Sequence, residues 1–508
     1  MTEPQGRPPQ QPGTGVGDEG GRLPILRLAG LTAAALLVHG YHLGVEDAEI
    51  YIPTAKKLLH PALYPYAEEF FLSHGHLSLF GPILAWTSRL THLPIDWSIF
   101  GWYLLTLFAT LASCWLLLRA CFTSPRARWT GVLVVTAVLA MPATNTGLLL
   151  IDPYMTARSF STPLTVFALA ALLERKYARA TMAALLTAAF HPQMVAYLIF
   201  LAVVLAVAER NRERVRERVP VMASAAGLLP TGFYLAPASG PYREALYSRD
   251  YFFLYNWSWY HWVGMLAPLA ILAWFWRRNL RGTKPAFSYL SFAMLPFGIL
   301  SIAAAAFLAS SPSLDMFARL QPLRTFHLIT LVLVLLLSGV IGEYLAKDRP
   351  WVPAALALPL ALGMFYVARQ TYPNSPQVEV PSQASSNGWV STLLWVRNHT
   401  PQDAVFAVDS RYFMDPEADV HGFRAVAERS ALADYFKDGG VVSLFPGLAD
   451  EWKQMSNATY GLNHFQADDF RRLKAEYPAI SWTVVHGTAP AGMECPRQQG
   501  GYAVCRMP

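Results

Sequence analysis

Three carboxylates gather in one short stretch near the N-terminus, GVEDAEI (residues 44–50), directly after an apolar segment. They belong to Glu46, Asp47 and Glu49. Crowding of carboxylates raises the pKa of at least one of them, which brings it towards the range of a general base. Because no histidine or cysteine stands beside them, Asp47 and Glu49 would suit Mg²⁺ or Mn²⁺ rather than zinc. A solvated acidic loop is the alternative interpretation.

Other polar side chains stand out in three later segments that interrupt apolar sequence. Arginine offers a planar fork of donors that matches phosphate oxygens, so a carboxylate near arginines suits group transfer from a lipid phosphate. Simpler roles remain open, because Asp152 could cap a helix and His191 could pack in a core. Arg319 and Arg324 could anchor helix ends. The candidates are Asp152 and Arg158 in IDPYMTARSF, His191, and Arg319, Arg324 and His327 in LDMFARLQPLRTFHL.

The composition indicates which kind of protein must position these residues. Of 508 residues, 54% are hydrophobic and 15% are charged, whereas soluble globular proteins carry about 25% charged residues. Residues 97–118 and 285–314 contain no charged side chain, and roughly 20 apolar residues span a bilayer as a helix. The net charge of +6 comes from basic residues between such blocks, which argues against a nucleic-acid partner. We therefore expect a polytopic membrane protein in contact with the lipid bilayer, with a buried all-helical core as the alternative.

Eleven membrane spans are expected, with residues 76–94 forming a re-entrant or surface-lying helix. With a cytoplasmic N-terminus, 20 lysines and arginines before residue 370 lie inside and nine lie outside, in agreement with the positive-inside rule. Pro192 predicts two short helices that meet at His191 in place of one long helix. The expected spans are residues 23–43, 97–118, 129–151, 159–173, 179–190, 193–208, 219–238, 260–276, 286–309, 326–342 and 351–368.

The chain divides into three expected parts. Residues 1–22, rich in Pro, Gln and Gly, form a disordered cytoplasmic tail, and residues 23–369 form the membrane domain, whose first external loop is 44–96. In residues 370–508, helix-like segments (389–397, 424–436, 466–475) alternate with strand-like ones (403–409, 481–487, 502–507), which predicts an external α/β domain. We expect a disulfide between Cys495 and Cys505 in this domain, with two free thiols as the alternative.

The order of these features has a counterpart among known proteins. An Asp47-Ala48-Glu49 motif in a long first external loop is followed by Asp152 after a later span and by a C-terminal external domain. In these respects the chain resembles the GT-C superfamily of polytopic glycosyltransferases. Its His191-Pro192 and Gln321–His327 stretches resemble those of uncharacterised bacterial members, whereas a WWDYG-like stretch of the oligosaccharyltransferase kind is lacking.

The resemblance implies a mainly α, GT-C-like protein of the bacterial inner membrane, with a periplasmic C-terminal domain. It implies transfer of a sugar from a polyprenyl-phosphate-linked donor to an acceptor in assembly of a cell-envelope glycan or glycoconjugate. Asp47 would act as the base or position the acceptor, Glu49 would support it or share a divalent cation (Mg²⁺ or Mn²⁺), and Asp152 would be a second acidic catalytic residue. Substrate binding would fall to Glu46, Arg158, His191, Arg319, Arg324 and His327.

Two other functions remain open at this point. A transporter or scaffold for envelope polysaccharide could use the same charges as a translocation path. Transporters often show paired broken helices, however, and the sequence has one such break, at His191-Pro192. A non-catalytic relative could keep the fold without the sugar donor. The sequence does not specify the sugar, the acceptor or the oligomeric state.

Overall fold

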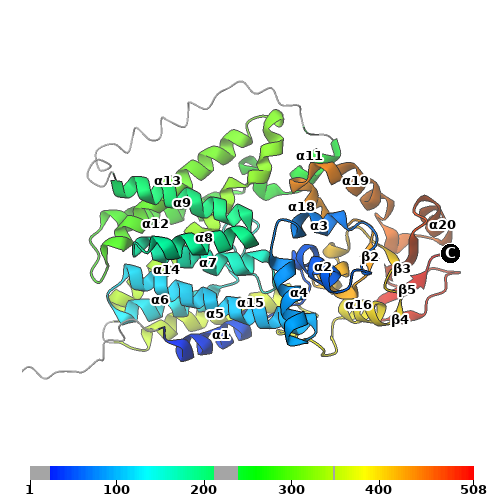
Figure 1. Ribbon diagram of the computed structural model, residues 1–508, viewed down its shortest axis with the longest axis horizontal. Helices are drawn as coiled ribbons and strands as arrows, with labels where there is room; N and C mark the ends of the chain where they lie inside the picture. Colours follow the sequence, from blue (N-terminus) through cyan, green and yellow to red (C-terminus); the bar gives the residue numbers. More distant parts are fainter. Residues whose placement is uncertain (1–22, 211–237, 239, 347–348) are drawn as a thin grey trace, which may run out of the picture.

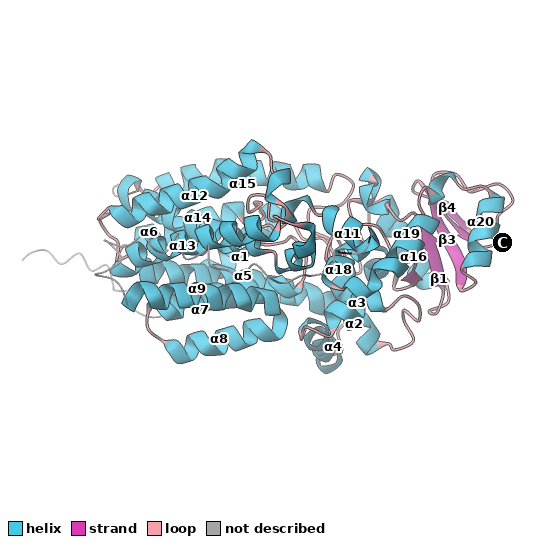
Figure 2. Ribbon diagram, turned by 90° about the horizontal axis from the view of Figure 1, so that it is seen from above, coloured by secondary structure: helices cyan, strands magenta, loops and turns pink. Residues whose placement is uncertain are grey.

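The computed structural model describes residues 23–210, 238, 240–346 and 349–508. The expected tail (1–22) and almost all of the expected span 219–238 lie outside these residues. The described chain is mainly helical, with a small sheet near the C-terminus. Its long axis runs from a bundle of apolar helices at one end to the sheet at the other (Figure 1, Figure 2).

The helices of the bundle fall where the apolar blocks predict them. Nine of the eleven expected spans coincide with a helix, and another falls almost entirely on residues that are not described. The expected span 129–151 is helical only to Val138, because the chain turns ahead of Pro142 and continues without helix to residue 151. The bundle has the character of a mainly helical membrane protein, while the number of eleven spans stays a prediction. Within the described ranges, five helical segments are long and apolar enough to cross a membrane: Ile95–Cys121, Pro192–Glu209, Pro285–Leu308, Pro312–Leu345 and Val352–Thr371.

The ten bundle helices among the described residues surround one apolar core, to which all except the last, α15, contribute buried side chains. They are α1 (Ile25–His39), α5 (Ile95–Cys121), α6 (Pro125–Val138), α7 (Ala157–Leu173), α8 (Tyr177–Phe190), α9 (Pro192–Arg210), α12 (Trp259–Arg277), α13 (Pro285–Leu308), α14 (Thr325–Leu345) and α15 (Val352–Thr371).

Two features at the outer end of the bundle follow from local sequence. The predicted break is confirmed, because α8 ends at Phe190 and α9 begins at Pro192, which cannot continue the hydrogen bonding of α8. The helix predicted within residues 76–94 is α4 (Phe80–Thr91), whose 12 residues measure about 18 Å, too short to cross a hydrocarbon core of roughly 30 Å. Trp86 and Leu90 on α4 are exposed, as a surface-lying helix requires.

Short helices from the segments that connect the bundle helices lie between the bundle and the sheet (Figure 1). The strand-like segment after α1 joins the two ends of the molecule through backbone hydrogen bonds: Tyr41 N–H donates to Gln377 at 3.0 Å, and Glu46 N–H donates to Val420 at 3.0 Å. The short helices are α2 (Ala48–Leu59), α3 (Glu69–Gly75) and α11 (Gly240–Tyr247), with the 3-10 turns η2 (Asp250–Phe252), η3 (Leu254–Asn256), η4 (Pro312–Leu320) and η5 (Pro322–Arg324).

The C-terminal part is a five-stranded sheet in the order β2-β1-β3-β5-β4, with β1 parallel to β2 and β3. Because side chains alternate along a strand, Val405 and Ala407 enter one apolar layer and Phe406 and Val408 the other. The elements are α16 (Gly388–His399), β1 (Val405–Val408), η6 (Tyr412–Met414), η7 (Pro416–Ala418), α17 (Phe423–Ala427), β2 (Ser430–Ala431), α18 (Lys437–Leu444), η8 (Pro446–Leu448), α19 (Ala449–Ala458), η9 (Leu462–His464), α20 (Ala467–Glu476), β3 (Ile480–His486), β4 (Arg497–Gln499) and β5 (Tyr502–Arg506).

The helix expected over 424–436 is wrong for most of its length. Helix α17 stops at Ala427, and Glu428 takes a left-handed conformation with φ of 55°. The chain then pairs as β2 alongside β1, so pairing with the sheet overrides helix propensity. In the same domain a disulfide joins Cys495, which precedes β4, to Cys505 within β5, as predicted.

Candidate functional site

Asp47 lies where three distant parts of the chain meet. It directly precedes α2, and its Oδ2 accepts a hydrogen bond from Nη2 of Arg158 in α7 at 2.9 Å. Its other oxygen, Oδ1, lies 3.1 Å from Nζ of Lys437 in α18, and the same ammonium pairs with Glu46. Asp47 thereby links the segment between α1 and α2, the bundle and the C-terminal domain, while 28% of its side chain stays exposed.

Arg158 is fixed in place by the start of α7. Thr156 and Ser159 form a capping box there, with the Ser159 hydroxyl accepting from Thr156 N–H at 3.1 Å, so the first turn that carries Arg158 is well defined. Its guanidinium also donates to Asp152 from Nη2 at 2.9 Å and from Nε at 3.3 Å. The predicted residues Asp47, Asp152 and Arg158 therefore form one connected cluster.

The protonation of this cluster differs from what crowded carboxylates alone would give. Burial opposes ionisation of Asp47, but Lys437, Arg158 and the more distant Arg324 outweigh it and hold the pKa of Asp47 well below its usual range. Burial prevails at Asp152, whose pKa is raised although Arg158 acts against it. At neutral pH Asp47 is ionised, so it is a weak proton acceptor and a good partner for a hydroxyl group.

Glu49, the second acid of the predicted motif, faces away from Asp47. Its carboxylate accepts hydrogen bonds from the backbone N–H groups of Arg424 and Ala425, each at 2.8 Å, and 1% of the residue is exposed. Burial raises the pKa of Glu49 to about 7, against the opposing effects of Arg424 and the two N–H groups. Positions i and i+2 of a helix do not share a face, so the pair splits between two environments.

A cavity of about 470 Å³ reaches α2 at Tyr51, four residues after Asp47, while Asp47, Asp152 and Arg158 are not among its lining residues. Tyr51 from α2 and His74 from α3 line it, and the charges of Asp47, Arg324 and Arg158 act on His74, whose pKa burial lowers to about 4. Apolar and aromatic side chains form much of the remaining wall. The cavity contains three predicted residues, His191, Arg319 and Arg324, together with Leu77, Phe190, Tyr197, Leu320 and Phe445.

Several polar groups in this cavity lack partners. Among the described residues, Nε of Arg324 and Nδ1 of His74 and of His191 are buried without a hydrogen-bond partner. Within the same ranges, no carboxylate pairs with Arg324 or Arg319, and Arg324 lies 5.7 Å from the ring centre of Tyr251. Two guanidinium groups without a counter-ion make the cavity suited to an anion.

His327 takes a different place from the other predicted residues. Its Nε2 lies 2.9 Å from the carbonyl oxygen of Leu150, and the residue is buried within the first turn of α14. It therefore fixes α14 against the loop that carries Asp152. It does not line the cavity of about 470 Å³, although it shares a much smaller one, of about 10 Å³, with Arg324.

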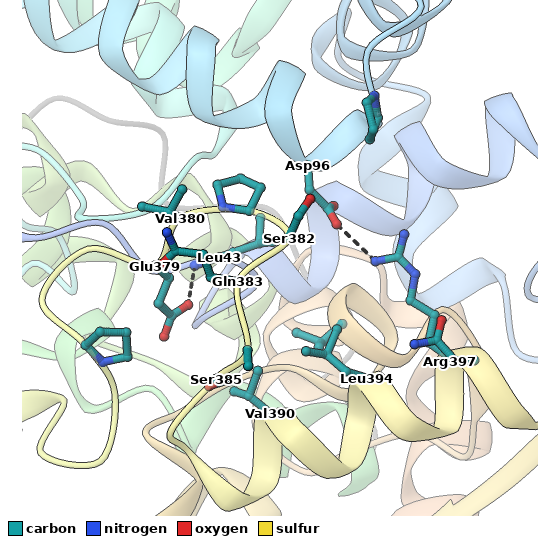
Figure 3. A pocket seen from close by; sticks show the side chains of 16 residues that line it. Leu43, Asp96, Glu379, Val380, Ser382, Gln383, Ser385, Val390, Leu394 and Arg397 are labelled. Carbon is teal, nitrogen blue, oxygen red and sulfur yellow. Dashed lines mark hydrogen bonds and ion pairs between the residues drawn. The ribbon is translucent and has the colours of Figure 1, made fainter.

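A second pocket, of about 550 Å³, lies between residues 376–385 and α16 (Figure 3). Its charged groups are already paired, since Arg397 Nη1 contacts Asp96 at 3.0 Å and Glu379 accepts from Leu43 N–H at 2.9 Å. No predicted site residue lines it. The cavity at Arg324 is therefore the better candidate for the site of chemistry.

The sequence nominated Asp47 and Glu49 as ligands of a divalent cation. Their carboxylates do not converge, because Asp47 is engaged by Arg158 and Lys437 and Glu49 by the backbone of α17. In the described part of the chain, no group of three or more His, Cys, Asp or Glu side chains is arranged to hold a metal ion. The arrangement therefore does not fit a cation shared by this pair.

Sequence reasoning missed three members of the site: Lys437, Tyr51 and His74. Tyr51 lies four residues after Asp47 on α2, so helical spacing could have nominated it. Lys437 lies 390 positions from Asp47 and carries no local signal of its role. Comparison with protein families and with curated proteins found no match for this chain.

Proposed function

We propose that this protein is a membrane glycosyltransferase that moves a sugar from a polyprenyl-phosphate donor to a hydroxyl acceptor on the extracytoplasmic side. The single observation that carries the proposal is the cavity lined by Arg324 and Arg319, which pair with no carboxylate among the described residues. Arg324 is also close enough to the ionised Asp47 to help lower its pKa. The proposed setting is the bacterial inner membrane, with the N-terminus in the cytoplasm and the C-terminal domain in the periplasm.

The two arginines would bind the phosphate of the donor. A guanidinium group binds phosphate oxygens through parallel hydrogen bonds, and Arg324 keeps an unused buried Nε donor. A cation that starts an apolar helix without a carboxylate partner is costly near the membrane and implies an anionic ligand. Arg324 opens α14 in this way, since η5 ends at Arg324 and the helix begins at Thr325.

The rest of the wall accounts for a lipid-linked donor. Leu77, Phe190 and Leu320 line the cavity, and Leu77 and Leu320 are exposed. The cavity sits where α8 and α9 meet at the outer end of the bundle. An amphiphile could therefore leave its chain among apolar side chains while its phosphate meets the arginines.

Asp47 would position the acceptor. The acceptor oxygen forms a bond to the anomeric carbon of the sugar, and the bond from that carbon to the phosphate oxygen breaks. The leaving phosphate keeps the electron pair, so Arg324 and Arg319 stabilise the charge that develops on it. Asp47 accepts the hydrogen bond of the attacking hydroxyl, and its low pKa favours this orienting role over lasting retention of the proton. As the new bond forms, the hydroxyl proton therefore passes by way of Asp47 to water.

The test is transfer of a radiolabelled sugar from polyprenyl phosphate by the purified protein, with membrane extract as the source of acceptor. We expect transfer by the wild type and a loss of at least about a hundredfold in D47N, as for removal of one orienting group. R324Q should instead weaken donor binding. R471Q is the control, because Arg471 lies on the surface of α20 and pairs with Asp468. Transport of lipid-linked glycan without any transfer would contradict the proposal.

A further inference from the structure

The C-terminal domain contributes a charge directly to the acidic loop of the membrane domain. Lys437 begins α18, and its ammonium lies 3.1 Å from Asp47 and pairs with Glu46. Only 13% of its side chain is exposed, and Nζ also lies 5.7 Å from the ring centre of Phe413. Figure 1 shows α18 next to the short helices α2 and α3. These two helices contribute Tyr51 and His74 to the cavity wall.

The position of Lys437 is set by a buried network in its own domain. Its backbone N–H donates to Asp434 at 2.5 Å, and Asp438, the next residue, accepts from Asp434 N–H at 2.8 Å. Asp438 also forms a two-pronged ion pair with Arg424, at 2.9 and 2.7 Å. Such planar pairing fixes orientation as well as distance, so the first turn of α18 has little freedom.

The same network returns to the membrane domain through Glu49. Glu49 accepts from the backbone N–H of Arg424, whose side chain holds Asp438. Both acids of the Asp47-Ala48-Glu49 stretch therefore end on α18, one through Lys437 and the other through Arg424 and Asp438. Removing one partner from a buried charge pair leaves the other charge uncompensated. These linked contacts therefore oppose separation of α18 from the acidic loop.

The cavity wall crosses the same boundary between domains. Phe445, which follows α18, lines the cavity, and its ring lies 5.3 Å from the ring of His74 in α3. His74 in turn stacks edge-on with Tyr51 at 5.9 Å. Helix α18 thus supplies a charge at one end and a wall of the cavity at the other.

We propose that Lys437 is a positioning residue of the transfer site, which holds the Asp47 carboxylate between itself and Arg158 so that Asp47 faces the incoming acceptor. The C-terminal domain then completes the site. This inference rests on the proposed glycosyltransferase function. Lys437 acts through Asp47 and is not assigned contact with the reacting atoms.

A change at Lys437 should alter both the orientation and the protonation of Asp47. The lysine is the first of the cations that lower the pKa of Asp47, so its removal shifts that pKa upwards. The acid limb of the activity profile should then move towards neutral pH. The groups that act on or beside Asp47 from the surrounding elements are Glu46, Tyr51, His74, Asp152, Tyr154, Arg158, His191, Arg324 and Lys437.

The experiment compares K437M and K437R in the full chain. K437M should lower kcat about tenfold to a hundredfold with a smaller change in the KM for the donor, the range that loss of one supporting contact costs in a site. K437R should restore most of the rate, because it restores the charge. K453M is the matched control, since the ammonium of Lys453 lies 2.7 Å from the carboxylate of Glu244 and does not pair with Asp47.

A second readout separates this inference from the proposed function. Amide hydrogen exchange of residues 44–52 should increase in K437M but not in K453M, because the acidic loop loses its anchor. Equal transfer and an unshifted pH profile in K437M, with an active wild type, overturn the positioning role alone. Unchanged exchange in K437M overturns it even if the wild type transfers no sugar, whereas an inactive wild type counts against the proposed function.

Discussion

Nη2 of Arg158 lies 2.9 Å from the carboxylate of Asp47 and 2.9 Å from that of Asp152. One guanidinium therefore holds together the acidic loop before α2 and the loop before α7. The two acids differ in their protonation, because the pKa of Asp47 is lowered by its cations and that of Asp152 is raised by burial. Asp47 is also the more exposed of the two, which makes it the acid that a substrate can reach.

Removal of Arg158 should destabilise the folded protein. R158Q leaves buried Asp152 without its partner, and breaking a buried pair costs about 3–5 kcal/mol. D152N added to R158Q should recover part of this loss, since the uncompensated charge is gone. Thermal unfolding in detergent measures both changes. A double variant no more stable than R158Q would show that the pair does not carry the effect.

Substitution of Asp47 should affect activity, whereas substitution of Glu49 should affect stability. D47N should lose transfer while the protein stays folded. E49A should unfold more easily by about 1–3 kcal/mol, because it leaves the buried N–H groups of Arg424 and Ala425 without an acceptor. Activity per folded molecule, measured beside the unfolding temperature, separates the two. A fully stable but inactive E49A would place Glu49 in the chemistry after all.

The stability of the C-terminal domain should depend on pH through His421. Its Nε2 lies 2.9 Å from Glu379; burial opposes its protonation, but Glu379 outweighs burial and raises the pKa of His421 above the usual 6.5. The stabilisation is therefore complete below pH 6.5 and is lost as the pH rises through the raised pKa. Unfolding free energies between pH 6 and 9 should fall in the wild type, and H421Q should lack this slope. Equal slopes in both proteins would count against the pair.

The disulfide should stabilise the edge of the sheet. Cys495 and Cys505 are separated by 10 residues, and closing a loop of that length stabilises a fold by about 2–3 kcal/mol in the chain-entropy account. Reduction, or C495S, should lower the unfolding temperature of the C-terminal domain. Mass spectrometry of the alkylated protein gives the redox state, with the buried Cys114 and Cys121 as internal thiols. Alkylation of all four cysteines without reduction would contradict the bridge.

The sequence predicted what depends on neighbours along the chain. Apolar blocks predicted the helices of the bundle, and Pro192 predicted the break between α8 and α9, because proline acts through its own backbone. The helix over 424–436 failed because Ser430 and Ala431 pair with a strand that lies 25 residues earlier. Local propensity carries no information on such partners.

The sequence predicted most residues of the candidate site but not all of the contacts that they make. Asp47, Asp152 and Arg158 do meet, and His191, Arg319 and Arg324 share a cavity. Helical spacing puts Asp47 and Glu49 on different faces but does not say what each one meets, since the partners of Glu49 come from α17 of another domain. The role of Lys437 could not be predicted from the sequence for the same reason, because it depends on the packing of α18 against α2.

The central claim is that the cavity at Arg324 binds the phosphate of a polyprenyl-linked donor next to Asp47. The most direct measurement is an experimental structure of D47N with polyprenyl phosphate sugar bound. We predict phosphate oxygens within about 3 Å of the Arg324 guanidinium, with the anomeric carbon facing residue 47. Density for the phosphate in the pocket between residues 376–385 and α16, with the Arg324 cavity empty, would contradict the account.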